Sequence, residues 1–147
     1  MVMQIEIEFL SETTKLPEKM SGLAAGYDLF ADLPSALTLL PGQRLLVGTG
    51  FALSIPAGYE GQIRPRSGLA NKHGITVLNS PGTIDADYRG EIKVLLINLS
   101  HKPFSIQPQM RIAQIVFAKH EQICFQLVQK LSHTDRGLAG FGSSDDD

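Results

Sequence analysis

The stretch EIKVLLINL, residues 91–99, carries the clearest structural signal in the chain. Its side chains alternate between two faces, as they do in a β-strand. Both faces are apolar: one carries Ile92, Val94 and Leu96, and the other carries Leu95, Ile97 and Leu99. A strand that is apolar on both faces has to be covered on both. The second cover is either the rest of the chain or another subunit, and the pattern is compatible with a central buried strand and with a homo-oligomer.

Short strand-like runs extend from this stretch in both directions along the chain. In QIEIEF, residues 4–9, polar and apolar residues alternate with the period of two that is typical of a half-buried strand. Turns rich in Pro, Gly and Ser separate the further runs. These runs are YDLFA (27–31), LTLL (37–40), RLLVG (44–48), FALSI (51–55), GQIRP (61–65), ITVLN (75–79), RIAQIVFAKH (111–120) and ICFQLVQ (123–129). Many short strands at this spacing predict an all-β, jelly-roll-like sandwich.

One segment, SGLANK at 67–72, is expected to form a short helical turn. Ser67 is the predicted N-cap, and the turn should end before Gly74. Free N–H groups and the helix dipole favour an anion at a helix start. Arg66, Ser67 and the amide of Gly68 are therefore candidates for binding one. The alternative is an ordinary capped turn with solvated arginines.

Composition narrows the possible classes of protein. The chain has 147 residues, of which 43% are apolar and 19% charged, as in a soluble single-domain protein. A net charge of −2 gives no reason to expect nucleic acid or an anionic membrane as a partner. The N-terminus MVMQIEIEFL lacks the basic region of a signal peptide, and no apolar run reaches membrane-spanning length. We therefore expect a cytoplasmic protein.

The last part of the chain differs in composition from the rest. Cys124, the only cysteine, lies in the apolar run ICFQLV and is predicted to be a buried, reduced thiol. From Arg136 onward the sequence RGLAGFGSSDDD is rich in Gly, Ser and Asp, which predicts a mobile tail. We therefore expect a β-domain over residues 1–135 and a flexible C-terminal lid of the same domain over 136–147.

Several polar residues stand where a purely structural interpretation requires none. In the hairpin TIDADYRGEI, residues 83–92, Asp85 and Tyr88 follow a Pro-Gly turn that needs neither a carboxylate nor a phenol. Gln114 shares a strand face with apolar residues and needs a partner, either a backbone group or a ligand. Asp28 interrupts an apolar strand and is expected to pair with an arginine or to hold a hydrated cation. The hairpin is therefore either a solvated loop or half of an active site.

Five segments of the chain resemble, in order, the five motifs of the trimeric dUTP diphosphatases (dUTPases). They are AAGYDLFA (24–31), RPRSGLA (64–70), GTIDADYRGEI (82–92), RIAQIVF (111–117) and RGLAGFGSS (136–144). The resemblance implies a jelly-roll (β-clip) homotrimer that hydrolyses dUTP to dUMP and diphosphate with Mg²⁺. This reaction supplies a precursor of dTMP and keeps uracil out of DNA. The resemblance also implies active sites built by three subunits, with the C-terminal lid of one subunit closing over the site of another.

In the hairpin, the resemblance implies that Asp85 orients and deprotonates the water that attacks the α-phosphorus. Tyr88 would lie flat against the deoxyribose and leave no room for a 2′-hydroxyl. Asn79, together with Thr83, Ile84 and the backbone around them, would read the uracil edge. A narrow slot of this kind can reject cytosine by mismatched hydrogen bonds and thymine by its methyl group.

The other motifs would bind the phosphates and the metal. By resemblance, Arg66, Ser67 and Gly68 would cradle the phosphate chain, and Gln114 would bond near the α-phosphate. Asp28 would reach the Mg²⁺ through water, because this ion keeps several waters and usually bridges phosphates. Structural roles are expected for Asp87 and Arg89 in the hairpin and for Arg111 at the start of the run 111–120.

In the C-terminal lid, the resemblance implies that Phe141 stacks on the uracil. The β- and γ-phosphates would be surrounded by Arg136, Gly140, Gly142 and Ser143. The usual family ending GFGSTG is GFGSSDDD in this chain. Three carboxylates thus follow close to a polyanion, which leaves the role of Ser144 open.

Two other functions are weighed against dUTP hydrolysis. The dCTP deaminases share the fold and resemble this chain around GEIKVLLIN, but they carry a catalytic Glu in that strand where Leu95 stands here. A nucleotide-sensing regulator would bind dUTP and serve mainly as an interaction platform. The intact Asp85 makes hydrolysis possible, while a regulatory role stays open beside it.

Overall fold

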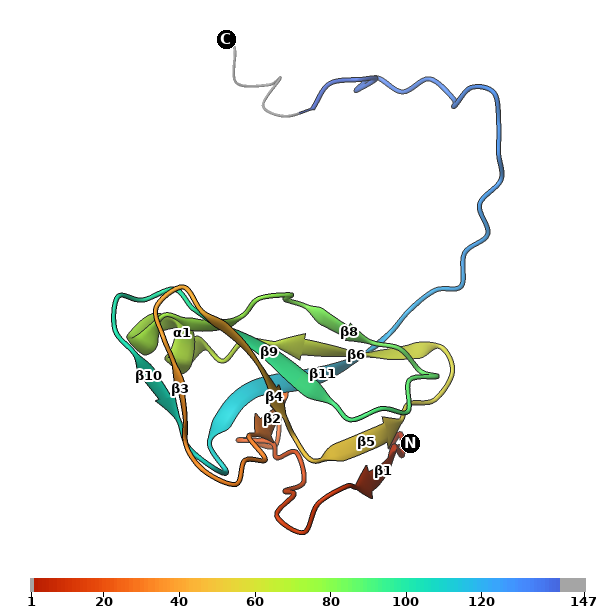
Figure 1. The fold of residues 1–147 in the computed structure, drawn as a ribbon. Helices are drawn as coiled ribbons and strands as arrows, with labels where there is room; N and C mark the ends of the chain where they lie inside the picture. Colours follow the sequence, from red (N-terminus) through yellow and green to blue (C-terminus); the bar gives the residue numbers. More distant parts are fainter. Residues whose placement is uncertain (1, 141–147) are drawn as a thin grey trace.

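The structure is a computed structural model that describes residues 2–140. Its elements in chain order are β1 (Glu6–Phe9), β2 (Tyr27–Phe30), β3 (Leu37–Leu39), β4 (Arg44–Gly48), β5 (Phe51–Ser54), β6 (Tyr59–Arg64), α1 (Ser67–His73), β7 (Ile75–Val77), β8 (Gly82–Ile84), β9 (Lys93–Asn98), β10 (Phe104–Ile106) and β11 (Arg111–Lys119). Figure 1 shows a body of short strands with the small helix at one end, and the chain leaves this body after β11. The prediction of an all-β fold with one short helical turn is confirmed.

The strands pair antiparallel in four small sheets. The largest has the order β2-β11-β6-β8, a second has the order β4-β9-β7, and β1-β5 and β10-β3 are two-stranded. Partners are rarely consecutive in the chain, as in jelly rolls. In the largest sheet β6 pairs with β11, with Arg64 opposite Gln114, and with β8, with Gln62 opposite Thr83. One strand therefore links the Gln114 region to the hairpin.

Stretch 91–99 supplies the centre of the second sheet. Ile92, Val94 and Leu96 are buried in the core against aliphatic side chains of the other strands. On the opposite face Leu95 and Ile97 are only half-buried, and Leu99 is 66% exposed. Within residues 2–140 this strand is therefore fully covered on one face only.

The helix α1 begins one residue earlier than a Ser67 cap requires. Arg66 occupies the N-cap position with an extended backbone and makes no side-chain capping bond, and Ser67 is the first helical residue. The predicted Ser67 cap is therefore wrong. The predicted end is confirmed: Gly74 follows the helix at φ 65°, in the left-handed region that glycine adopts without a Cβ penalty. No helix in the described part of the chain has the length and apolar character needed to span a membrane.

Three segments differ from the sequence prediction. β8 and β10 lie in stretches that the sequence assigns to turns, because Pro81 and Pro103 directly precede them. The run 123–129 forms no strand within the described residues. It is exposed and lies beyond the β-body (Figure 1), so it has no strand edge to pair with. Cys124 is exposed too, and its predicted burial is wrong.

Candidate active site

The hairpin segment 79–92 forms one wall of an open cavity of about 260 Å³. β8 pairs with β6, and a turn follows in which the Tyr88 N–H donates to the Asp85 carbonyl at 3.2 Å. The cavity is lined by Leu46, Thr83, Ile84, Asp85, Tyr88, Glu91 and Lys93. The structure thus brings four predicted site residues of the hairpin to one cavity.

Asn79 does not line this cavity. It is exposed beyond the end of β7 and precedes a cis Ser80–Pro81 peptide. Its side-chain nitrogen would lie 3.1 Å from a Cβ on the buried Gly82. The Asn79 amide therefore packs over a glycine at the start of β8, next to the hairpin but outside the cavity wall.

Hydrogen bonds within the hairpin set the shape of its turn. The Tyr88 hydroxyl donates to the Glu91 carbonyl at 3.1 Å. Arg89 Nη1 donates to the carbonyls of Ala86, at 2.6 Å, and Tyr88, at 3.1 Å. Arg89 therefore binds the backbone of its own hairpin, in keeping with a structural role.

Sequence reasoning missed three residues of the cavity: Leu46, Glu91 and Lys93. Glu91 Oε1 accepts a hydrogen bond from the Gly50 N–H at 3.0 Å, and its Oε2 lies 3.5 Å from Lys93 Nζ. Glu91 and Lys93 could have been found, because alternate residues of an extended segment share a face. Leu46 could not, since only the pairing of β4 with β9 brings it to the hairpin.

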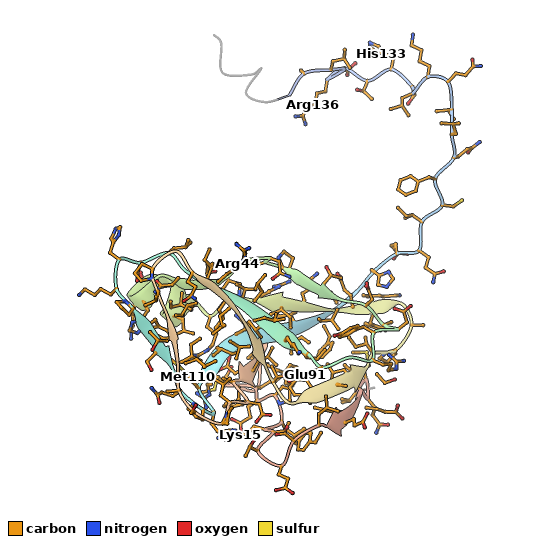
Figure 2. The ribbon with its side chains drawn as sticks, in the orientation of Figure 1. Lys15, Arg44, Glu91, Met110, His133 and Arg136 are labelled. Carbon is orange, nitrogen blue, oxygen red and sulfur yellow. The ribbon has the colours of Figure 1, made fainter. Side chains whose placement is uncertain are left out.

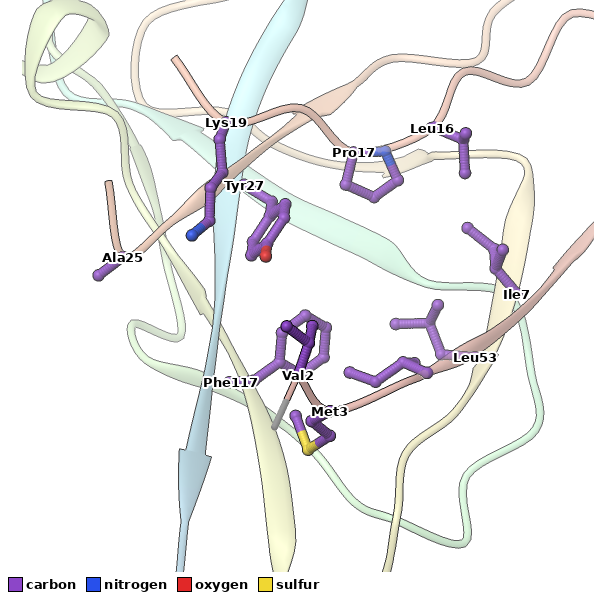
Figure 3. A pocket seen from close by; sticks show the side chains of 11 residues that line it. Val2, Met3, Ile7, Leu16, Pro17, Lys19, Ala25, Tyr27, Leu53 and Phe117 are labelled. Atoms are coloured by element: carbon purple, nitrogen blue, oxygen red, sulfur yellow. The ribbon is translucent and has the colours of Figure 1, made fainter. Parts of the chain in front are cut away.

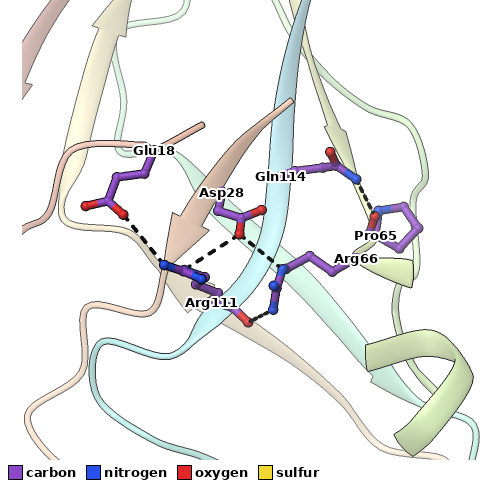
Figure 4. A network of polar contacts seen from close by, with 6 residues as sticks. All are labelled: Glu18, Asp28, Pro65, Arg66, Arg111 and Gln114. Atoms are coloured by element: carbon purple, nitrogen blue, oxygen red, sulfur yellow. Dashed lines mark hydrogen bonds and ion pairs between the residues drawn. The ribbon is translucent and has the colours of Figure 1, made fainter. Parts of the chain in front are cut away.

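A second polar cluster joins β2, β11 and the residues before α1 (Figure 4). Asp28 is only 7% exposed, and its Oδ2 lies 3.4 Å from Arg66 Nε and 3.7 Å from Arg111 Nε. Arg111 also lies 3.7 Å from Glu18, and Arg66 Nη1 donates to the Arg111 carbonyl at 3.3 Å. A buried carboxylate needs pairing of this kind. Of the two alternatives for Asp28, the structure therefore contains the pairing with arginine.

This arrangement bears on metal binding. Asp28 Oδ2 accepts no hydrogen bond from the described residues, but two guanidinium groups already face it. Among residues 2–140 there is no group of three or more His, Cys, Asp or Glu side chains that could hold a metal ion. The residues present do not fit a metal site formed by the protein alone, so a Mg²⁺ ion would have to be carried mainly by the phosphates of a ligand.

Gln114 finds the backbone partner that the sequence left as one alternative. Its Nε2 donates to the Pro65 carbonyl at 2.9 Å (Figure 4). Its Oε1 lies against Gly26, where any Cβ would collide with it. The Gln114 amide is thus oriented by the chain segment that leads to Arg66.

The remaining predicted residues are not brought to the Asp85 cavity within one chain. Its lining includes none of the predicted phosphate-binding residues Arg66, Ser67, Gly68 and Gln114. Ser67 and Gly68 are exposed at the start of α1. Arg136, labelled in Figure 2, lies on the extended segment away from the β-body and donates to the Ala139 carbonyl at 3.0 Å. Gly140 ends the described chain, and the predicted residues Phe141, Gly142 and Ser143 lie outside the described residues, as do Ser144 and 145–147.

A larger cavity of about 450 Å³ lies beside β1 and β2 (Figure 3). Its lining is mostly apolar and includes Val2, Ile7, Leu53 and Phe117, with the ionisable groups of Lys19 and Tyr27. It contains none of the predicted site residues. We therefore place the candidate site at the hairpin, where the Asp85 carboxylate and the Tyr88 phenol line the same cavity.

Short antiparallel strands, an open cavity lined by a carboxylate and a phenol, and a separate arginine cluster define the class: a small all-β protein with a polar candidate ligand site. Comparison with known proteins makes the assignment specific. The family model described as dUTPase matches residues 12–145. The chain belongs to the dUTPase family.

Similar proteins agree with this assignment. The deoxyuridine 5'-triphosphate nucleotidohydrolase of Orientia tsutsugamushi (strain Ikeda) is 53% identical over 132 residues, which cover 90% of this chain and 89% of that protein. The protein of the same name from Chlamydia pneumoniae is 57% identical over 129 residues, which cover 87% and 89%. Among solved structures, the Staphylococcus bacteriophage 80alpha dUTPase with dUPNHPP matches with a TM-score of 0.84 at 27% identity, over 96% of this chain and 98% of that one.

Proposed function

We propose that this chain hydrolyses dUTP to dUMP and diphosphate, and so supplies a precursor of dTMP and keeps uracil out of DNA. The observation that carries the proposal is the cavity that Asp85 and Tyr88 line together with Thr83 and Ile84. These residues belong to a chain that is more than half identical to several deoxyuridine 5'-triphosphate nucleotidohydrolases.

In the proposed reaction, Asp85 accepts the proton of the water that attacks the α-phosphorus. Its carboxylate is exposed on the cavity wall and therefore accessible to water. A positioned general base of this kind contributes roughly 10²–10⁴ in rate. Tyr88 packs against the deoxyribose, while Asn79, Thr83 and Ile84 surround the uracil.

The triphosphate is bound by the arginine cluster and the start of α1. Arg66, Ser67 and Gly68 contact the phosphate oxygens, and Gln114 lies near the α-phosphate. Asp28 holds Arg66 in place and would contact a Mg²⁺ ion, if one is bound with the nucleotide, only through water. The C-terminal lid, residues 136–147, closes the site. Its contributing residues are Arg136, Gly140, Phe141, Gly142 and Ser143.

We infer a homotrimer with shared active sites. In one chain the arginine cluster and the Asp85 cavity are separate. The second sheet exposes apolar side chains, with Leu46 at 57% and Leu99 at 66%. The segment after β11 extends away from its own body (Figure 1). All three features are explained if neighbouring copies complete each site.

The test is the release of diphosphate from dUTP, dCTP, dTTP and UTP by the full chain. We expect rapid release from dUTP and at most slow release from the other three. Ammonia release from dCTP would instead identify a deaminase, although Leu95 stands in β9 where those enzymes carry their acid. Tight dUTP binding without turnover would identify a nucleotide-sensing regulator and contradict hydrolysis.

A further inference from the structure

Gly90 lies directly against the ring of Tyr88. A Cβ placed on Gly90 would lie 2.6 Å from Cζ of Tyr88 and 2.9 Å from its Cε2, and it would collide with the hydroxyl. Non-bonded carbon atoms normally stay about 3.5–4.0 Å apart. The ring occupies its present position only because residue 90 has no side chain.

The glycine is not required by the backbone at this position. Among the described residues, the glycines with positive φ are Gly42, Gly50, Gly58, Gly74 and Gly137. The φ of Gly90 therefore lies outside the left-handed region that favours glycine. The close approach of the Tyr88 ring is the physical reason for a glycine here.

The Tyr88 ring is partly exposed and lies against its own hairpin. The Tyr88 side chain is 45% exposed, so its outer face is not packed against the core. Its hydroxyl donates to the Glu91 carbonyl, one residue beyond Gly90. The 90–91 segment thus supplies both the surface under the ring and the acceptor at its tip.

We propose that Gly90 is a specificity-determining position, which orients the Tyr88 ring so that the site selects deoxyribose over ribose. Gly90 does not touch the nucleotide and acts through Tyr88 as a positioning residue. The inference rests on the proposed function, because the contact between Tyr88 and the sugar is part of that proposal.

The test is a double-mutant cycle with Gly90→Ala, Tyr88→Ala and the combined variant, assayed for kcat/KM on dUTP and on UTP. In Gly90→Ala the ring has to shift by about 1 Å, and a misplacement of that size can cost ~10²-fold. We expect kcat/KM for dUTP to fall about tenfold or more, mainly through KM, and the ratio of UTP to dUTP hydrolysis to rise. In a chain that already carries Tyr88→Ala, adding Gly90→Ala should change neither value.

Gly22→Ala is the matched control, because a Cβ on Gly22 meets nothing within 4 Å and its φ is not positive. It should behave like the wild type. An unchanged UTP/dUTP ratio in Gly90→Ala overturns the inference. So does the same loss with and without the Tyr88 ring, because Gly90 would then act through the backbone.

A measurement on the wild-type chain keeps the inference testable if Gly90→Ala does not fold. Nuclear Overhauser contacts between the Tyr88 ring protons and the Gly90 α-protons, recorded without nucleotide, should be strong. Their absence from an enzyme that hydrolyses dUTP overturns the role of Gly90 and leaves the proposed function intact. A wild-type chain that shows the contact but hydrolyses no dUTP overturns the proposed function, and sugar selection with it.

Discussion

Asp85 and Asp87 stand two residues apart, and both are exposed, but only Asp85 lines the cavity. They therefore form a matched pair for testing the general base. Asp85→Asn should keep dUTP binding and lower kcat by at least about 100-fold, because an amide cannot take the proton of the attacking water. Asp87→Asn should stay within a few-fold of the wild type. Steady-state diphosphate release measures turnover, and calorimetry with a non-hydrolysable dUTP analogue measures binding. Near-normal turnover by Asp85→Asn would show that Asp85 is not the general base.

Asp28 is the carboxylate that faces both Arg66 and Arg111. Asp28→Asn leaves both guanidinium groups facing a neutral amide. Because Arg66 is then held less firmly, we expect weaker binding of the triphosphate and a higher KM for dUTP. The loss of stability should be about 1–3 kcal/mol, less than for a fully buried pair because the arginines are 29% and 35% exposed.

Glu18→Gln is the control for this prediction. Its side chain is 55% exposed, and an exposed ion pair with Arg111 contributes about 0–1 kcal/mol. Urea unfolding and KM for dUTP distinguish the two variants. Equal effects would show that burial at Asp28 gives it no special part in holding Arg66.

β9 carries the core, and its two faces differ in burial. Leu96 is fully buried on the inner face, so Leu96→Ala should lower the free energy of unfolding by about 2–5 kcal/mol. Leu23→Ala is the matched change at a fully exposed side chain and should stay within about 0.5 kcal/mol of the wild type. Denaturant unfolding of both variants checks the difference. A similar loss in both would mean that the inner face of β9 is not the core.

The strands that could be predicted are those with an apolar or alternating pattern, including the three-residue strands β3 and β7. β1, β9 and β11 alternate or are continuously apolar over four residues or more, and the sequence identifies them. β8 and β10 each follow a proline directly, Pro81 and Pro103, which is a turn signal, and they form strands by pairing with β6 and β3. Strand pairing also accounts for what sequence reasoning missed in the site, since Leu46 reaches the hairpin only through the pairing of β4 with β9.

The polar residues also differ in whether their surroundings are local in the sequence or come from distant parts of the chain. Asp85 and Tyr88 could be predicted because a turn requires neither a carboxylate nor a phenol. Apart from Leu46, the residues that line their cavity are neighbours in the chain. For Asp28 and Gln114 the sequence could only name alternatives, because their partners Arg66 and Pro65 come from a different strand connection. The Ser67 cap failed for a local reason: the helix starts at Ser67 itself, so the N-cap position falls to Arg66, whose side chain makes no capping bond.

The molecule as a whole leaves apolar surface in two places that a single chain does not cover. One is the outer face of the β4-β9-β7 sheet, where Leu99 is 66% exposed. The other is the segment 123–131, where the side chains of Ile123, Phe125 and Leu127 are 72%, 91% and 99% exposed. Such surface marks an interaction site in a soluble protein. The alternation at 123, 125 and 127 is that of a strand, so this segment has the pattern of a strand whose partner lies in another copy.

Two truncations separate assembly from catalysis. A chain ending at Asp135 keeps segment 123–131 and should still form trimers, but it loses Arg136 and the rest of the lid. Charge-assisted hydrogen bonds contribute about 1.5–3 kcal/mol each, so turnover should fall by at least about tenfold. A chain ending at His120 also loses the apolar side chains of Ile123, Phe125, Leu127, Val128 and Leu131. A side chain of this size stabilises by about 1.5–3 kcal/mol when fully buried. This shorter chain should sediment as a smaller species at micromolar concentration, while circular dichroism still reports the β-body. A chain ending at His120 that remains trimeric would show that segment 123–131 lies outside the interface, and an Asp135 chain with full activity would show that the lid is not needed for turnover.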